Sequence, residues 1–85
     1  MFFVYILKSL KDKKLYIGST NNLKKRILLH NSGAVFSTKF RKPLKLVYYE
    51  AYSSEKEARY REKNLKLRAH ALQQLLKRIK ESISA

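Results

Sequence analysis

The chain has 85 residues and no cysteine, and its 20 lysine and arginine residues against 6 acidic ones give a formal charge of +14. This length predicts one domain with a modest core, and the lack of cysteine excludes disulfide bonds and thiolate metal sites. A cationic excess of this size indicates a polyanionic partner, with nucleic acid as the first candidate and an anionic membrane surface as the second.

Hydropathy predicts neither export nor insertion into a membrane. No apolar run approaches the ~18 residues that a transmembrane helix needs. Residues 1–7 lack the basic segment and the small-residue cleavage site of a signal peptide. We therefore expect a cytoplasmic location and no membrane partner.

Two short apolar runs at the start of the chain predict two strands. Residues 2–8 are rich in aromatic and β-branched side chains, and residues 15–18 follow after a polar connection. Because this connection is short, antiparallel pairing is expected. Gly18 is expected to end the second strand, where glycine permits a close backbone approach or an unusual dihedral angle.

A basic helix is predicted over residues 22–31. Asn21 and Asn22 are both suitable N-caps, because a short side-chain oxygen can accept from free amides of the first turn, and Gly33 is a suitable C-terminal cap. Arg26 and His30 are four residues apart and therefore share one helix face, with about 5–6 Å between their Cβ atoms. The expected apolar stripe of this helix consists of Leu23, Ile27 and Leu28.

Residues 34–43 are predicted to form a loop that mixes basic, hydroxyl and aromatic side chains. This mixture suits contact with a nucleic acid. The alternative is that Phe36 and Phe40 simply anchor the loop in the core, and the sequence leaves the two interpretations equally open.

A third strand over residues 44–52 and two helical segments complete the chain. Ser54 and Glu57 have the spacing of a capping box, which predicts a helix from about Glu55. A basic amphipathic helix is predicted over about 69–83. A membrane surface could also accept it, but packing on a small core is favoured. The expected fold class is α+β, a three-stranded antiparallel sheet flanked by helices, in one domain over residues 1–85.

Several short motifs follow one another in a fixed order along residues 2–68. They are Phe3-Val4-Tyr5, Tyr16-Ile17-Gly18, Arg26, His30, Thr38, Arg41-Lys42-Pro43, and Glu57-Ala58 leading to Glu62 and Lys66. This series resembles the GIY-YIG nuclease superfamily, in particular small stand-alone bacterial members related to structure-specific endonuclease subunits. The resemblance implies the GIY-YIG nuclease fold and metal-dependent hydrolysis of DNA, with 5′-phosphate and 3′-hydroxyl products.

The resemblance also implies roles for the polar residues of these motifs. Tyr5 and Tyr16 are the candidates for activating water; Tyr5 is favoured as the base, although the family analogy does not settle which tyrosine takes the proton. A phenol titrates near pH ~10, so this role requires nearby cations or a metal. Arg26 would stabilise charge at the phosphate, and His30 would contact the phosphate or orient a tyrosine. The alternatives are packed strand tyrosines, a surface arginine and a helix-capping histidine.

Glu62 is the candidate metal ligand that the resemblance implies. A single carboxylate suits Mg²⁺ or Mn²⁺, which keep several waters and take further oxygens from phosphate. The alternative role of Glu62 is an ion pair with Lys66, four residues later on the same helix.

Contacts to nucleic acid are expected from basic and hydroxyl side chains in several segments: Thr20, Lys24, Lys25, Thr38, Lys39, Arg41, Lys42 and Lys66. The expected function is a metal-dependent endonuclease, directed by DNA structure and with low sequence specificity, because the chain has no room for a separate targeting domain. Repair flaps and branched junctions are candidate substrates, and a partner subunit and the oligomeric state stay open. The second hypothesis is a catalytically silent nucleic-acid-binding module that acts through RNA or a partner protein. The presence of both tyrosines, Arg26 and Glu62 favours the enzyme.

Overall fold

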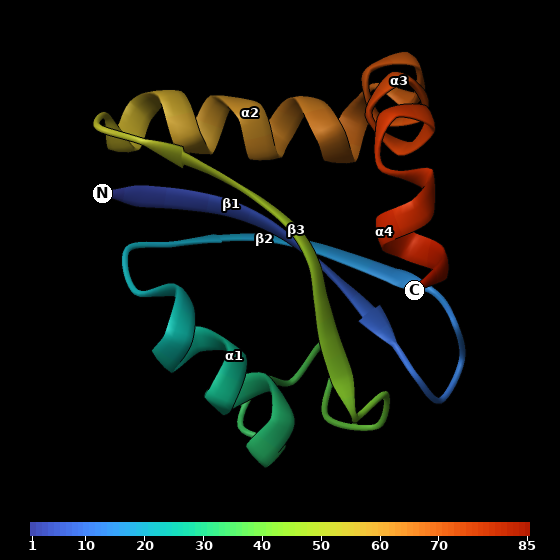
Figure 1. The fold of residues 1–85 in the computed structure, drawn as a ribbon. Helices are drawn as coiled ribbons and strands as arrows, with labels where there is room; N and C mark the ends of the chain where they lie inside the picture. Colours follow the sequence, from blue (N-terminus) through green and yellow to red (C-terminus); the bar gives the residue numbers. More distant parts are fainter.

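The structure is a computed structural model that describes residues 1–85. Its three strands form one antiparallel sheet, as the sequence predicts, and their order is β2-β1-β3 (Figure 1). The elements in chain order are β1 (Phe2–Ser9), β2 (Leu15–Thr20), α1 (Leu23–Ser32), β3 (Leu44–Tyr52), α2 (Glu55–Leu67), α3 (Ala69–Arg78) and α4 (Lys80–Ser84). None of these helices is both long and apolar enough to cross a membrane.

The central strand β1 is buried on both faces, because helices cover the sheet from two sides (Figure 1). Successive side chains of a strand point to opposite faces. Val4 and Ile6 therefore pack towards α2 and α3, in a cluster that includes Leu65 and Leu75. Tyr5 belongs to the second cluster, on the α1 side. This second cluster contains a phenol in place of an aliphatic side chain, and the candidate site begins there.

Helix α1 has the ends that the sequence predicts. The side chain of Asn22 accepts a hydrogen bond from the backbone amide of Lys25 at 3.1 Å, and Gly33 takes the left-handed conformation at φ 84°. The expected apolar stripe is wrong at Leu28, which is 64% exposed. Leu28 follows Ile27 directly, so it is rotated by about 100° around the helix axis and faces away from the sheet.

The predicted helix over about 69–83 is divided into α3 and α4 at Ile79. Ile79 is buried and Ile83 packs against the same cluster, so the bend keeps both segments on the core. The side chain of Lys8 from β1 donates to the carbonyl of Ile83 at 2.8 Å and so satisfies a carbonyl near the end of α4. At the start of α2, the Ser54 side chain accepts from the amide of Glu57 at 3.3 Å, which is one half of the expected capping box.

Candidate active site

Tyr5 and Gly18 are direct partners across β1 and β2, and the phenol of Tyr5 lies over the glycine. A Cβ atom on Gly18 would come within 2.5 Å of the Tyr5 hydroxyl oxygen and 2.6 Å of the ring carbon that carries it. Any side chain at position 18 would therefore displace Tyr5. Glycine is needed at position 18 because it allows this close approach. The expected end of the strand at Gly18 is wrong, since β2 continues to Thr20.

The structure brings Tyr5, Tyr16 and His30 into one cluster. Tyr16 precedes Gly18 by two residues and therefore lies on the same face of the sheet as Tyr5. The ring centroids are 6.4 Å apart for the two tyrosines and 4.9 Å apart for Tyr16 and His30. The Tyr5 hydroxyl lies 2.9 Å from Nε2 of His30. Helix α1 supplies the histidine, because its last turn faces the centre of the sheet.

The other ring nitrogen of His30, Nδ1, lies 2.7 Å from the hydroxyl of Thr38. Thr38 and His30 are both 0% exposed. A neutral imidazole has one donor nitrogen and one acceptor nitrogen, so one of the two hydroxyls donates to the ring and the other accepts from it. His30 therefore links Tyr5 to Thr38 in one buried chain of hydrogen bonds.

Burial and a neighbouring guanidinium set the protonation states in this cluster. Burial, and to a smaller extent the positive charge of Arg26, lowers the pKa of His30 to about 4, so the imidazole is neutral at pH 7. Burial raises the pKa of Tyr5 above its usual value of 10.0, while the nearby Arg26 acts in the opposite direction. Proximity to Tyr5 raises the pKa of Arg26. In the free protein, Tyr5 is thus a neutral phenol beside a permanent cation.

The lowered pKa of His30 predicts acid sensitivity. An unfolded chain binds a proton at its histidines near pH 6.5, whereas folded His30 binds one only near pH 4. The contribution of His30 to the free energy of unfolding is therefore fully present above pH 6.5. It falls by about 2–3 kcal/mol as the pH is lowered towards 4. Urea unfolding at a series of pH values between 7 and 4.5 measures this slope.

The chain supplies a matched control for this measurement. His70 is the second of the two histidines and is exposed. We expect His30→Gln to remove most of the slope between pH 6.5 and 4.5, and His70→Gln to keep the wild-type slope. A His30→Gln protein with an undiminished slope would assign the acid sensitivity to another group.

Glu62 lies on the other face of β2 from the tyrosines. Ser19 follows Gly18, so its side chain points towards α2, and its hydroxyl donates to Oε1 of Glu62 at 2.6 Å. The ammonium of Lys66 lies 2.8 Å from Oε2. Partial burial would raise the pKa of Glu62, but the hydrogen bonds from Lys66 and Ser19 outweigh it and hold the pKa below its usual 4.5. Both anticipated roles of Glu62 thus remain compatible with the geometry, since the ion pair with Lys66 is formed.

A divalent cation fits Glu62 as a single protein ligand. The carboxylate is ionised, partly exposed, and keeps lone pairs that Ser19 and Lys66 do not use. No group of three or more carboxylate, histidine or cysteine side chains gathers anywhere in the structure. An ion at Glu62 would therefore complete its shell with water and phosphate oxygens, as Mg²⁺ readily does.

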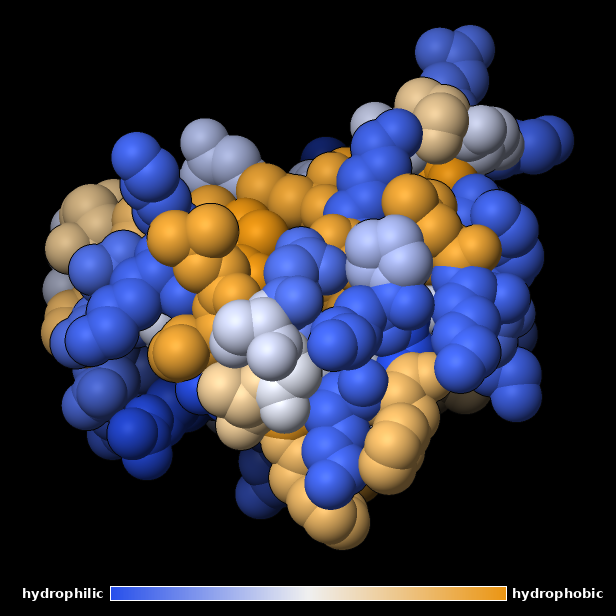
Figure 2. Space-filling model, turned by 90° about the horizontal axis from the view of Figure 1, so that it is seen from below, coloured by the Kyte–Doolittle hydropathy of each residue, from blue (hydrophilic) through white to orange (hydrophobic).

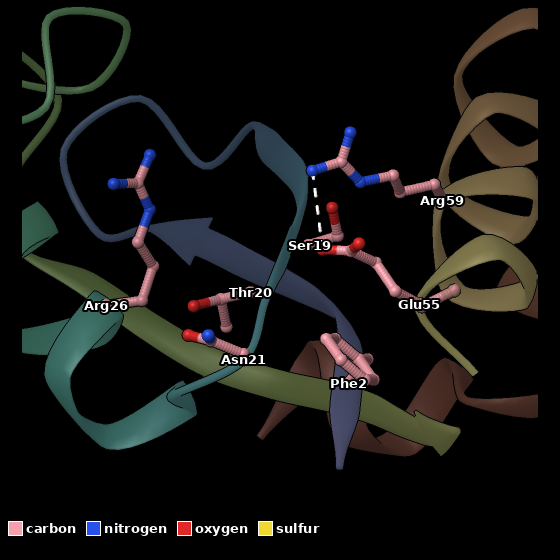
Figure 3. A pocket seen from close by; sticks show the side chains of 8 residues that line it. Phe2, Ser19, Thr20, Asn21, Arg26, Glu55 and Arg59 are labelled. Carbon is pink, nitrogen blue, oxygen red and sulfur yellow. Dashed lines mark hydrogen bonds and ion pairs between the residues drawn. The ribbon is translucent and has the colours of Figure 1, made fainter. Parts of the chain in front are cut away.

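A polar cleft of about 270 Å³ crosses the end of β2 between α1 and α2. Arg26 from α1 and Arg59 from α2 flank it on opposite sides, and Ser19, Thr20 and Asn21 lie between them (Figure 3). Arg59 also makes an ion pair with Glu55 on the rim, at 3.4 Å. Two guanidinium groups on opposite walls match the charge and the forked geometry of a phosphodiester.

The remaining residues predicted to bind nucleic acid have different surroundings. Lys24, Lys25 and Lys42 are exposed, Lys39 packs between two aromatic rings, and Thr20 accepts from the amide of Asn22 and lines the cleft. Arg41 is held by Asp12 at 2.8 Å. Thr38 is enclosed, with its hydroxyl on His30, so its side chain cannot touch DNA in this conformation. Its place in the site is to orient His30.

Sequence reasoning overlooked three residues of the site, namely Ser19, Asn21 and Arg59. Ser19 could have been found from strand alternation, since a neighbour of Gly18 must face the opposite side. Arg59 precedes Glu62 by three residues and therefore shares its helix face. Asn21 stands out in the sequence only as an N-cap candidate, and nothing there marks it as a residue of the site.

Comparisons with known proteins place the chain among close relatives. A family model described as the GIY-YIG catalytic domain matches residues 1–78. A UPF0213 protein of Clostridium perfringens is 51% identical over 67 residues, which cover 78% of this chain and 71% of that protein. A UPF0213 protein of Staphylococcus haemolyticus is 46% identical over 80 residues, covering 93% and 94%. The NMR structure of the UPF0213 protein BH0048 from Bacillus halodurans superposes with a TM-score of 0.56 and 36% identity, covering 91% of this chain and 84% of that one.

Proposed function

The chain belongs to the GIY-YIG nuclease family, and from this premise and the geometry of the cleft we propose that it is a metal-dependent endonuclease that hydrolyses DNA phosphodiester bonds. The observation that carries the proposal is the meeting of two groups at β2. Tyr5, Tyr16, Arg26 and His30 gather on one face of this edge strand, and the ionised Glu62 lies on the other. The polar cleft between them is lined by Arg26 of the first group and by Ser19, the hydrogen-bond partner of Glu62, while Glu62 itself lines a neighbouring depression that shares Arg59 with the cleft.

In the proposed mechanism, the phosphate lies in the cleft between Arg26 and Arg59. Arg26 stabilises the negative charge that develops on the phosphoryl oxygens, since a guanidinium donates two parallel hydrogen bonds. A divalent cation held by Glu62 would add charge stabilisation at phosphate oxygens. Arg26 lies beside the tyrosines as well as the cleft, so one side chain connects phosphate binding to the phenols.

Tyr5 is the proposed base, in its ionised form. When its proton passes to solvent, the oxygen can accept a hydrogen bond from Nε2 of His30 and stays beside the positive charge of Arg26, and both favour the phenolate. The phenolate then accepts a proton from the attacking water, while Tyr16 positions that water or the phosphate. His30 does not exchange the proton in this scheme; it holds Tyr5, and Thr38 holds His30.

We further propose that DNA structure, rather than sequence, directs the enzyme, as in the processing of branched repair intermediates. The charge of +14 favours phosphate contacts, which do not distinguish bases. The side chains that line the cleft are mainly guanidinium, hydroxyl, amide and carboxylate groups, suited to a backbone.

Incubation of the purified protein with plasmid and branched DNA tests this proposal. With Mg²⁺ or Mn²⁺ we expect nicking and cleavage at branch points, and with EDTA we expect binding without cleavage. Tyr5→Phe removes only the hydroxyl and should lose activity while retaining DNA affinity. Tight binding without cleavage in any divalent cation would instead indicate the binding module.

A further inference from the structure

The segment between α1 and β3 presents two phenylalanine rings to solvent. Phe36 is 85% exposed and Phe40 is 75% exposed. They do not anchor the loop in the core, because Val35 and Thr38 fill that role. The backbone forms two successive turns, in which the amide of Thr38 bonds to the carbonyl of Val35 and the amide of Arg41 to that of Thr38. These turns direct Val35 and Thr38 inwards and the rings outwards.

A lysine lies between the two rings. The ammonium of Lys39 is 5.4 Å from the ring centroid of Phe36 and 4.8 Å from that of Phe40, within cation–π range. We name this group, Phe36, Lys39 and Phe40, the aromatic platform. Figure 2 views the molecule from the side of α1 and this loop, and apolar patches there alternate with hydrophilic side chains. The platform therefore combines exposed π faces with positive charge.

The aromatic platform is tied to the candidate active site by hydrogen bonds. Thr38, which lies between Phe36 and Lys39 in the sequence, bonds to Nδ1 of His30, and Nε2 of the same ring lies 2.9 Å from the Tyr5 hydroxyl. The platform residues thus lie next to the segment that orients the proposed base. The cleft lies at the start of α1 and the platform follows the end of this ten-residue helix, about 15 Å further on, so a DNA strand in the cleft would run along α1 to reach the platform.

We propose that the aromatic platform binds an unpaired nucleobase of the DNA strand held in the cleft. This inference rests on the proposed function and names its substrate class as DNA with unpaired bases near the cleaved bond. An unpaired base offers a π face that stacks on an exposed ring, whereas bases within a duplex have their faces covered by neighbours. Lys39 attracts the adjoining phosphate. A second copy of the chain is disfavoured as occupant, because two molecules of charge +14 repel each other.

The test measures binding and cleavage separately. Binding is measured in EDTA with an oligonucleotide that contains 2-aminopurine, either single-stranded or paired in a duplex. Wild type should quench the fluorescence of the single strand, as a stacked base requires. The double variant Phe36→Ala/Phe40→Ala should lose quenching and bind the single strand roughly 5- to 150-fold more weakly, the range expected for one stacked base. Its duplex affinity should change less than about twofold.

Control variants separate stacking from folding and from loss of apolar surface. Leu28→Ala removes an exposed apolar side chain of α1 and should bind like wild type. Phe36→Trp/Phe40→Trp keeps flat rings and should retain quenching. Circular dichroism and thermal unfolding should show the alanine variant folded, since both rings are exposed. Equal affinity of the alanine variant and wild type for the single strand, or equal losses on single strand and duplex, would overturn the proposal.

Three further outcomes have distinct meanings. A wild-type dimer in light scattering that the alanine variant converts to a monomer, with DNA binding unchanged, would assign the platform to self-association and overturn the proposal. Quenching by wild type without cleavage in Mg²⁺ or Mn²⁺ would support the platform while removing the proposed nuclease. Cleavage by the alanine variant at the wild-type rate, on unpaired and paired substrates alike, would support the nuclease and overturn the role of the platform.

Discussion

Replacing Glu62 with glutamine is expected to abolish metal-dependent cleavage, with a loss of roughly a thousand-fold or more. A bound cation supplies several kcal/mol of transition-state stabilisation, and each ~1.4 kcal/mol corresponds to a factor of ten in rate. Glutamine keeps the size of the side chain and an oxygen that can accept from Ser19, but it lacks the charge that holds a cation. Titration with Mn²⁺, followed by electron paramagnetic resonance, should show the loss of a bound-ion signal independently of activity.

The matched control for this variant is Glu57→Gln, which makes the same change at an exposed position of α2 and should leave metal binding and cleavage unchanged. Metal-free DNA affinity of Glu62→Gln should be equal or higher, because a charge that repels phosphate has been removed. If Glu62 serves only as the partner of Lys66, the sole effect will be a few tenths of a kcal/mol in stability. A folded Glu62→Gln protein that cuts DNA at the wild-type rate would refute the metal site.

The expected result for Arg26→Ala is a loss of cleavage by on the order of a hundred-fold or more, with a much smaller loss of DNA affinity. Arg26 is one of 20 basic residues that attract the backbone, but its position at both the cleft and the tyrosines is not duplicated. Arg26→Lys should recover only part of the rate, because an ammonium lacks the planar fork of a guanidinium.

Two further measurements separate a role at the site from surface charge. Lys77→Ala removes an equal charge from an exposed position of α3 and should keep the wild-type rate. The charge of Arg26 contributes to the low pKa of His30, so this pKa should rise in Arg26→Ala, as NMR titration of the ring will show. Burial, the larger cause, persists and limits the rise. Identical rates for Arg26→Ala and Lys77→Ala would make Arg26 an ordinary surface cation.

Local sequence determines most of the secondary structure of this protein. Asn22 and Gly33 bound α1 because capping depends on a side-chain oxygen and a left-handed residue within a few positions of the helix end. The three strands follow from runs of β-branched and aromatic residues. The pairing of Tyr5 with Gly18 is also largely a local matter. The two strands are adjacent in the sequence and antiparallel, so the short connection between them limits their register.

Tertiary structure alone decided which of the candidate residues lie together. The sequence left Phe36 and Phe40 open between core and surface, and it placed Thr38 among the residues that bind nucleic acid. Burial of Thr38 against His30 answers both questions, because two backbone turns that bury Val35 and Thr38 leave the two rings exposed. The link from Ser19 to Glu62 spans 43 positions and depends on how α2 packs across the edge strand. Such contacts arise when distant segments pack together, and the residue pattern of neither segment predicts them.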